Sequence, residues 1–541
     1  MASRTFLEVL GHVMFSFTRS VTDHYNPEEP EYTAESFGYS PLESTGLEWY
    51  HHPVDEFIYK EYSDREITNT CYLAASSLDV RVTNACSVVE NEATADREEV
   101  DRGTAWKRLR PSVCCTVCKS MYFGGLISLL SAIITGTIYM LVSYLCYKTV
   151  NLCEFSPPNR TLIPERVQWM RTLSTVIAYI VLYNWFFATA LLLFRMYQLK
   201  GLKMKLFLSY CLFYCLDAGY RVTVQVLGIS YSKLSVLQKI PTNVLFLASF
   251  GFQVYILTKQ FCTRLVKRKI FLFLQLSASG YLTFILALIF THFIYPAYIK
   301  RSKEGKLIIA LFAPLTGVLL KLASRICAQR LWNITHPGYS YVLLAPLYYG
   351  SAVVFRVLQA DLGSLHSIVV LGIIHGAAEV IERSTMVVID HICHLLWHRK
   401  SAPWGSFRTP RRERLMADIA ILSMLSESAA IISVNGVLYL YQWTYLENSS
   451  FVNLVHSFAI HTSVPLLIEW FFNSASLAIE TRYQNMPVMA VWRRQWKRHI
   501  LVAIVNAVPI AVFLSGNLLS VVHELFAEAN VNQQTCKIPF T

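Results

Sequence analysis

Long apolar segments separated by short polar ones follow one another from residue 121 to residue 520. A membrane-spanning helix needs about 20 mostly apolar residues to cross ~30 Å of hydrocarbon. A helix also satisfies its own backbone hydrogen bonds, for which lipid offers no partner. We therefore predict an all-α, polytopic transmembrane helix bundle of about eleven spans. Their approximate bounds are 121–147, 173–197, 205–230, 240–261, 270–295, 307–326, 340–359, 364–388, 415–442, 453–479 and 500–520.

The N-terminal region lacks this pattern. Residues 1–115 are polar and acidic, and the stretch "DHYNPEEPEYTAESFGYSPLEST" (Asp23–Thr45) is dominated by Pro, Glu, Ser and Tyr. Such a composition cannot bury enough apolar surface to offset the entropy lost on ordering. We predict three regions: a largely disordered cytosolic tail over 1–115, the helix bundle over 116–525, and a short extracytoplasmic tail over 526–541. The acidic tail is a candidate surface for a cytosolic protein partner.

The composition supports a membrane protein. Of the 541 residues 54% are hydrophobic, only 16% are charged, and the mean hydropathy is +0.38. Soluble domains carry about 25% charged residues, so the lipid bilayer is the expected partner. Residues 1–101 contain 20 acidic and 6 basic side chains (−14), and the remainder contains 16 and 42 (+26), which gives the total of +12. The basic surplus lies in short loops beside the spans, so it does not indicate nucleic-acid binding.

The loops predict an orientation. Lys and Arg are more frequent in the loops on the N-terminal side, which favours a cytosolic N-terminus. The outer "KRSKEGK" (Lys300–Lys306) departs from this bias. With eleven spans the C-terminus is extracytoplasmic. We expect an integral membrane protein of the eukaryotic secretory pathway, in the plasma membrane or an endomembrane.

Two glycosylation sequons fall in the predicted outer loops, at Asn159 and Asn448. A third, at Asn333, falls on the predicted cytosolic side, where it is not glycosylated. Cys153 and Cys536 share the oxidising side, so they are candidates for a disulfide.

Three cysteines, Cys114, Cys115 and Cys118, precede the first span. Juxtamembrane thiols are candidate acylation sites. A single CxxC without a second half is weak evidence for zinc, and no cofactor or metal is predicted.

Ionisable residues inside the spans are the strongest functional signal. Insertion of Asp, Lys or Arg at the centre of a membrane helix costs roughly 2.5–3.5 kcal/mol. In the third span Asp217 and Arg221 are four residues apart, so they lie on one helix face and can form an ion pair. The pair is either structural or part of a gate or binding site.

The eighth span places His375, Glu379 and Arg383 in one polar stripe, with Glu382 beside it. It also contains a GxxxG motif at Gly372–Gly376, which lets a neighbouring helix approach closely. The alternative is that this span ends before Glu382 and that Glu382 and Arg383 lie in cytosolic water.

The ninth and tenth spans add more such groups. Glu427 lies near the middle of the ninth, and His461 and Glu469 flank Pro465 in the tenth. Proline frees a helix carbonyl. Antiparallel neighbours can bring Glu427, Glu469 and Glu379 together, and clustered carboxyl groups in a low dielectric suit a proton or cation site. The alternative is that each carboxyl is hydrogen-bonded separately to neutral side chains.

Three cations, Lys321, Arg325 and Arg356, are expected to extend toward the membrane interfaces. The zinc-protease HExxH and serine-hydrolase GxSxG motifs are absent from the sequence. A lone histidine, His375 or His461, remains a candidate base.

The leading hypothesis is secondary transport or conduction of a small ion or solute. Asp217 and Arg221 would support a site in the eighth to tenth spans. The candidate site residues are His375, Glu379, Glu427, His461 and Glu469. The alternatives are a non-catalytic receptor or scaffold, and a membrane-embedded lipid-modifying enzyme.

Overall fold

The computed structural model describes most of the chain after residue 112. The described ranges are 113–150, 163–194, 198–229, 235–262, 266–331, 334–335, 338–362, 364–398, 410–445, 450–482, 486 and 488–525. The acidic tail, the sequons at Asn159, Asn333 and Asn448, and the cysteines Cys153 and Cys536 lie outside the described residues.

The described residues fold into helices, and none of them forms a β-strand. The helices of the first half are α4 (Val113–Ser131), α5 (Thr137–Tyr147), α6 (Glu165–Leu193), α7 (Lys203–Val226), α8 (Ser235–Phe261), α9 (Val266–Ile289) and α10 (Tyr295–Ile299). Those of the second half are α11 (Lys303–Gln329), α12 (Ala345–Asp361), α13 (Leu365–His398), α14 (Pro410–Tyr445), α15 (Phe451–Arg482) and α16 (Val488–Leu525).

Nine helical segments of the described chain are long and apolar enough to cross a membrane. Two of them join separate helices through a π-helical turn: α4 with α5 at Ala132–Gly136, and α9 with α10 at Phe290–Ile294. The nine are Val113–Tyr147, Glu165–Leu193, Leu237–Phe261, Val266–Ile299, Glu304–Gln329, Leu365–Met386, Arg414–Thr444, Phe451–Thr481 and Val488–Ser515. The helices are those expected of a multi-pass membrane protein.

Two of the eleven segments expected from the sequence form helices but do not meet this criterion. One is α7, whose Lys203, Lys205, Asp217 and Arg221 lower its mean hydropathy. The other is α12, which has 17 residues and follows a 3-10 turn. Every residue of α12 from Ala345 to Gln359 is buried. Its side chains therefore contact other helices rather than lipid, and they need not be uniformly apolar.

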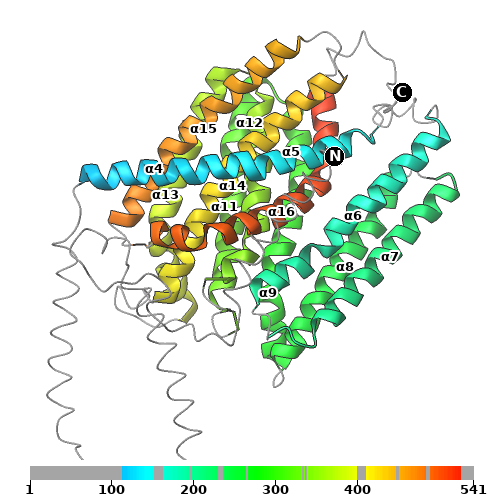
Figure 1. Cartoon of the computed structure of the whole chain (residues 1–541), viewed down its shortest axis with the longest axis horizontal. Coiled ribbons are helices and arrows are strands. Elements are labelled where there is room, and N and C mark those ends of the chain that lie inside the picture. Colours follow the sequence, from blue (N-terminus) through cyan, green and yellow to red (C-terminus); the bar gives the residue numbers. More distant parts are fainter. Residues whose placement is uncertain are drawn as a thin grey trace, which may run out of the picture.

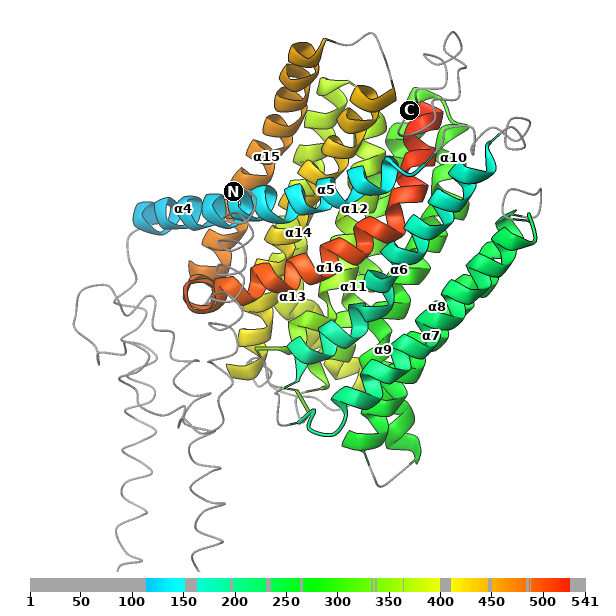
Figure 2. The same ribbon diagram turned by 45° about the vertical axis from the view of Figure 1, so that its right-hand side comes forward.

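Helix α14 lies at the centre of the bundle, with 89% of its most apolar window buried. Helix α12 packs against α14, and α13 packs against α15. Helices α4 and α5 cross in front of α14 and α15, and α6, α7 and α8 lie side by side at the right of both views (Figures 1 and 2). Helices α12–α15 therefore enclose the bundle interior in which the charged side chains gather.

Small residues allow the closest helix approaches. On α13, a Cβ added at Gly372 would meet Ile468 of α15 at 3.5 Å, and one added at Gly376 would overlap the ring of Phe472. The GxxxG motif at these positions therefore faces α15, as its spacing predicted for a neighbouring helix. This close contact brings the polar stripe of α13 against α15.

The expectation that three cations extend to the interfaces is wrong. Lys321, Arg325 and Arg356 are 7%, 2% and 7% exposed. A guanidinium cannot shed its charge in a protein, so a buried arginine requires acceptors inside the bundle. For Arg356 those acceptors are carboxylates of other helices, described next.

Candidate functional site

Arg356 of α12 lies between two carboxylates at the centre of the bundle. Its Nη2 donates to Oε2 of Glu469 on α15 at 2.7 Å, and it lies 3.4 Å from Oε2 of Glu427 on α14. Its Nη1 donates to Oε1 of Gln359 at 2.8 Å, and Gln359 donates to the carbonyl of Ile368. One guanidinium therefore serves two acidic side chains from two different helices.

A second guanidinium, from α13, lies further along α15. Arg383 of α13 donates to both carboxylate oxygens of Glu480 on α15, through Nε at 2.7 Å and Nη2 at 2.8 Å. Its Nη1 donates to Asn473 Oδ1 at 3.0 Å, and Asn473 Nδ2 donates to Glu469 Oε1 at 3.0 Å. Asn473 therefore links the Arg356 and Arg383 groups into one continuous network.

We call this network the charged chain. Its members are Glu427, Arg356, Glu469, Asn473, Arg383 and Glu480, with Glu379 beside it. From Glu469 to Glu480 is 11 residues of one helix, which corresponds to ~16 Å of rise. The charged chain therefore extends over about half of the ~30 Å hydrocarbon thickness.

Glu379 of α13 joins the charged chain from the side. Ser423 of α14 donates to its Oε1 at 2.7 Å, and Arg383 Nη1 lies 3.9 Å from the same atom. Its carboxyl group also lies in the electrostatic surroundings of Arg356 and Glu469. Glu379 therefore joins Glu427 and Glu469 around the two guanidinium groups.

Further charged groups lie close to the charged chain. Lys321 of α11 lies in the electrostatic surroundings of Glu382 and Glu427, with its Nζ 4.9 Å from the ring centre of Tyr348. The acidic groups of this region are Glu379, Glu382, Glu427, Glu469 and Glu480. The cations are Lys321, Arg356, Arg383 and the buried Arg325 one turn along α11. Acidic and basic side chains of five helices therefore gather in one part of the bundle.

The structure thus brings together the three carboxyl groups of the eighth to tenth predicted spans, Glu379, Glu427 and Glu469. His375 is half-buried one turn before Glu379, and its electrostatic surroundings include Arg356 and Glu379. Its Nε2 is buried and has no hydrogen-bond partner within the described part of the chain. His375 therefore belongs to the surroundings of the charged chain without bonding to it.

His461 of α15 has other contacts. Its Nδ1 lies 2.9 Å from the carbonyl of Ser457 and 3.1 Å from the hydroxyl of Tyr439. Its carbonyl is the one that Pro465, four residues on, leaves without a helix donor, and Asn435 Nδ2 of α14 donates to it at 2.9 Å. Asn435 thus compensates for the proline, and the His461 ring contacts Tyr439 and Ser457 rather than the charged chain.

Asp217 and Arg221 form the expected pair on α7. Arg221 Nε lies 2.8 Å from Asp217 Oδ2, and its guanidinium stacks 4.0 Å from the ring centre of Tyr179 on α6. Helix α7 packs against α6 and α8. The pair therefore lies apart from α12–α15 and from the charged chain.

The juxtamembrane cysteines occupy the start of α4. Cys114 and Cys118 are exposed and Cys115 is half-buried. Within the described ranges no group of three or more His, Cys, Asp or Glu side chains has the arrangement of a metal site. The thiols are thus accessible for modification, and their acylation stays a prediction.

Three members of the charged chain were not recognised as site residues from the sequence: Arg356, Asn473 and Glu480. Arg383 was predicted to lie in the polar stripe of the eighth span, but it was not among the candidate site residues. Glu480 falls just beyond the predicted end of the tenth span, although it lies on the same face of α15 as Glu469. That helical spacing was the available signal, because positions three, four, seven and eleven residues apart share a face.

Comparison of the chain with protein-family models, with curated proteins and with solved structures finds no match. The helices and the charged chain therefore carry the functional argument. They define a class: a polytopic helical bundle compatible with the membrane, with ionisable side chains paired across helices in its interior.

Proposed function

We propose that the protein is a secondary transporter or ion-conducting membrane protein that binds protons in the charged chain. The observation that carries the proposal is the gathering of Glu379, Glu427 and Glu469 around the Arg356 and Arg383 guanidinium groups inside the bundle. Carboxyl groups clustered in a low dielectric favour the binding of a proton, because the proton removes one of several like charges. Intramembrane ionisable groups of this kind often belong to ion or proton pathways.

Arg356 gives the site two arrangements. It donates to Glu469 at 2.7 Å and lies 3.4 Å from Glu427. A proton that neutralises Glu469 weakens its attraction for Arg356, so the guanidinium then favours Glu427. Loss of that proton restores the first arrangement. Binding of a proton thereby shifts the balance between helices α14 and α15, as coupled transport requires of its coupling site.

The charged chain also connects the site to Glu480. Asn473 and Arg383 bond Glu469 and Glu480 into one network, which ends near the end of the apolar segment of α15. A guanidinium keeps its protons, so Arg383 and Asn473 hold these carboxylates in place and do not carry the proton. His375 lies one turn before Glu379 with a buried Nε2, and an imidazole can both accept and release a proton. We assign it to proton exchange with Glu379 and Glu469. Asp217 and Arg221 have a supporting role on the separate group α6–α8.

The proposal includes the membrane topology. Helices α7 and α12 complete eleven spans, because α7 runs beside α6 and α8 and α12 is enclosed by the bundle (Figures 1 and 2). The N-terminus is then cytosolic and the C-terminus extracytoplasmic. The basic loops and the positions of two sequons support this orientation.

One observation favours a second function, a non-catalytic receptor or scaffold. Most polar atoms of the charged chain already have protein partners, as a purely structural network requires. In that case the charged chain fixes the helix arrangement, and the acidic tail recruits a partner. The two functions differ in whether the carboxyl groups exchange protons.

The test is proton flux in proteoliposomes with an internal pH-sensitive dye and a potassium diffusion potential. Glu379→Gln and Glu469→Gln keep the side-chain volume and remove the proton site, so both should reduce the flux at least about tenfold, the effect of ~1.4 kcal/mol. Glu304→Gln, at an exposed position in the first turn of α11, is the matched control and should leave the flux unchanged. Wild-type flux in both interior variants, or no proton flux in the wild type, contradicts the proposal.

A further inference from the structure

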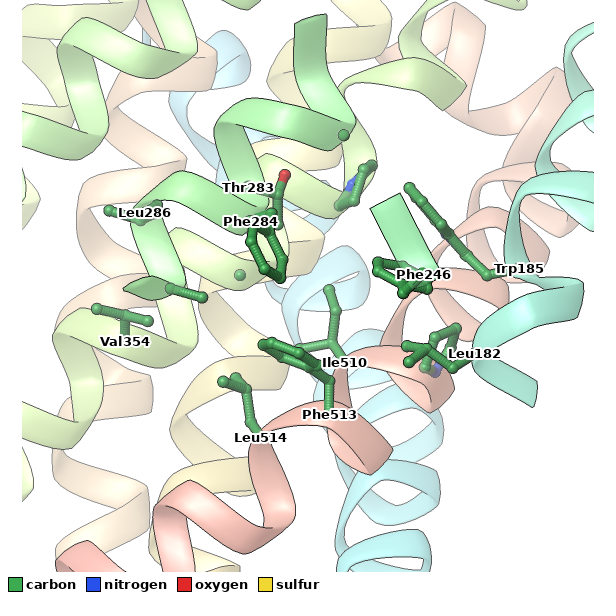
Figure 3. Close-up of a pocket in the computed structure, with 15 residues that line it drawn as sticks. Leu182, Trp185, Phe246, Thr283, Phe284, Leu286, Val354, Ile510, Phe513 and Leu514 are labelled. Carbon is green, nitrogen blue, oxygen red and sulfur yellow. The ribbon is translucent and has the colours of Figure 1, made fainter. Parts of the chain in front are cut away.

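An apolar groove lies between helices α6, α8, α9, α12 and α16 (Figure 3). Buried aliphatic side chains such as Leu286, Val354 and Leu514 form its floor. Half-buried aromatic rings, including Trp185 and Phe284, form its rim. The groove contains about 620 Å³ of empty space, counting its open side.

The groove offers no polar recognition. Its one hydroxyl, on Thr283, donates to the carbonyl of Ser279 at 2.7 Å. The indole N–H of Trp185 donates to Asn506 Oδ1 at 2.9 Å. Water does not occupy an apolar cavity without polar partners, and an ion would lose its hydration there without compensation. The occupant must therefore be apolar along the part that enters the groove.

The groove lies among helices that are long and apolar enough to cross a membrane. Trp185 and Phe284 belong to the segments Glu165–Leu193 and Val266–Ile299, and α16 contributes Ile510 and Phe513. In a bilayer, a molecule that enters the groove therefore comes from the membrane interior. Lipid chains surround this site at high concentration, and an unfilled groove would forfeit the dispersion contacts of its lining.

We propose that this groove binds one acyl chain of a membrane lipid. Its lining is apolar and comes from five helices, and the groove is narrow, which suits a flexible linear chain rather than a compact molecule. Lipid chains elsewhere in the bilayer are equally apolar. Preference for the groove therefore comes from packing against the aromatic rim, and the lipid headgroup stays outside.

The groove is connected to the charged chain through α12. Gly350 and Val354 face the groove, whereas Arg356 is two residues further, which is about 200° around the helix. An acyl chain and the charged chain thus contact opposite faces of one buried helix. The groove assignment does not depend on proton transport, because it is measured by lipid binding alone.

The experiment is fluorescence quenching in bilayers that contain increasing fractions of a phosphatidylcholine with mid-chain bromines. The Trp185 signal is the difference between the protein and its Trp185→Phe variant. Trp443, which is 52% exposed, gives the reference for ordinary surrounding lipid through Trp443→Phe. The quantity compared is the half-point, the bromolipid fraction at which quenching of a given tryptophan is half-maximal. The maximal extent of quenching is not compared, because it depends on the depth of each ring in the bilayer. Trp185 should reach half-quenching at roughly one-tenth of the bromolipid fraction that Trp443 needs, equivalent to ~1.4 kcal/mol of preference.

Filling the groove gives the decisive comparison. Ala287 lines it, so Ala287→Phe should move the Trp185 half-point to the Trp443 value. Ala287→Leu adds less volume and carries the test if the larger side chain prevents folding. Gly219→Leu is the control, since a Cβ there meets nothing within 4 Å on α7. The proposal is overturned if Trp185 and Trp443 share one half-point in the wild type, or if the filling variants leave the Trp185 half-point unchanged.

Discussion

The Arg356 guanidinium donates to the Glu469 carboxylate at 2.7 Å, and this bond joins the second half of α12 to the middle of α15. Both side chains are almost fully buried, at 8% and 4% exposure. A pair in such a place gains little net stability over apolar side chains of the same volume, whereas removing one partner leaves a buried charge uncompensated. Removing one partner of this ion pair should therefore destabilise the protein much more than replacing both partners together.

Arg356→Ala should lower the free energy of unfolding by ~3–5 kcal/mol, because Glu427 and Glu469 lose their shared cation. Thermal unfolding in detergent measures the loss. Arg166→Ala, at an exposed position in the first turn of α6, should change it by less than about 0.5 kcal/mol. Adding Glu469→Gln to Arg356→Ala should recover part of the loss. A double variant less stable than the single one would show that Glu469 has other essential cationic partners.

The Arg383–Glu480 pair depends on geometry as well as on charge. Its two bonds, 2.7 Å and 2.8 Å long, use the planar fork of the guanidinium, while Nη1 remains for Asn473. A lysine cannot reproduce this arrangement. Arg383→Lys should therefore cost roughly 1.5–3 kcal/mol, the range for hydrogen bonds to charged groups.

A double-mutant cycle of Arg383→Lys with Glu480→Gln measures that effect by chemical denaturation. Lys306→Arg is the matched control, because Lys306 bonds Asp361 by a single contact at 3.0 Å and is 24% exposed. It should be close to neutral. A coupling energy near zero between Arg383 and Glu480 would mean that the bidentate geometry contributes nothing.

The sequence predicted more of the fold than of the site. Hydropathy located the helices because apolar composition over about 20 residues is a local property. Two of the predicted spans, α7 and α12, form helices that are not both long and apolar enough to count as membrane spans. The reasons differ: α7 contains charged residues, and α12 is short and buried along almost its whole length. Contacts with protein relax the demand for an apolar surface, and the sequence does not state which helices are enclosed.

Three carboxyl groups of the site were recognised from the sequence, whereas Glu480 and the pairing of the carboxylates with Arg356 and Arg383 were not. Glu379, Glu427 and Glu469 were expected at similar depth, and the structure places them around Arg356. Arg356 was expected at an interface, because its distance from a span end suits a long side chain that reaches water. Its actual partners are Glu427 of α14 and Glu469 of α15, which follow Arg356 in the sequence by 71 and 113 residues. Helix adjacency of that kind is not encoded locally.

The close approach of α13 and α15 yields a steric prediction. A Cβ at Gly376 would overlap the Phe472 ring, and overpacking a tight core costs roughly 1–3 kcal/mol. Gly376→Ala should therefore destabilise the protein by that amount in thermal unfolding. Gly219→Ala, where a Cβ meets nothing within 4 Å, should be neutral or stabilising by up to ~1 kcal/mol because alanine is the better helix former. Phe472→Leu combined with Gly376→Ala should recover stability; no recovery would place the clash elsewhere.

The proline in α15 provides a test of backbone compensation. Pro465 has no N–H to offer the carbonyl of His461, and Asn435 Nδ2 from α14 donates to it instead at 2.9 Å. Asn435→Ala should leave a carbonyl without its donor and cost ~1–3 kcal/mol. Pro465→Ala restores a helix N–H at the right position, so the double variant should be more stable than Asn435→Ala alone. Unfolding free energies of the four proteins in this cycle measure the coupling. Additive effects would show that Asn435 stabilises α14 and α15 by packing rather than by replacing the hydrogen bond that proline removes.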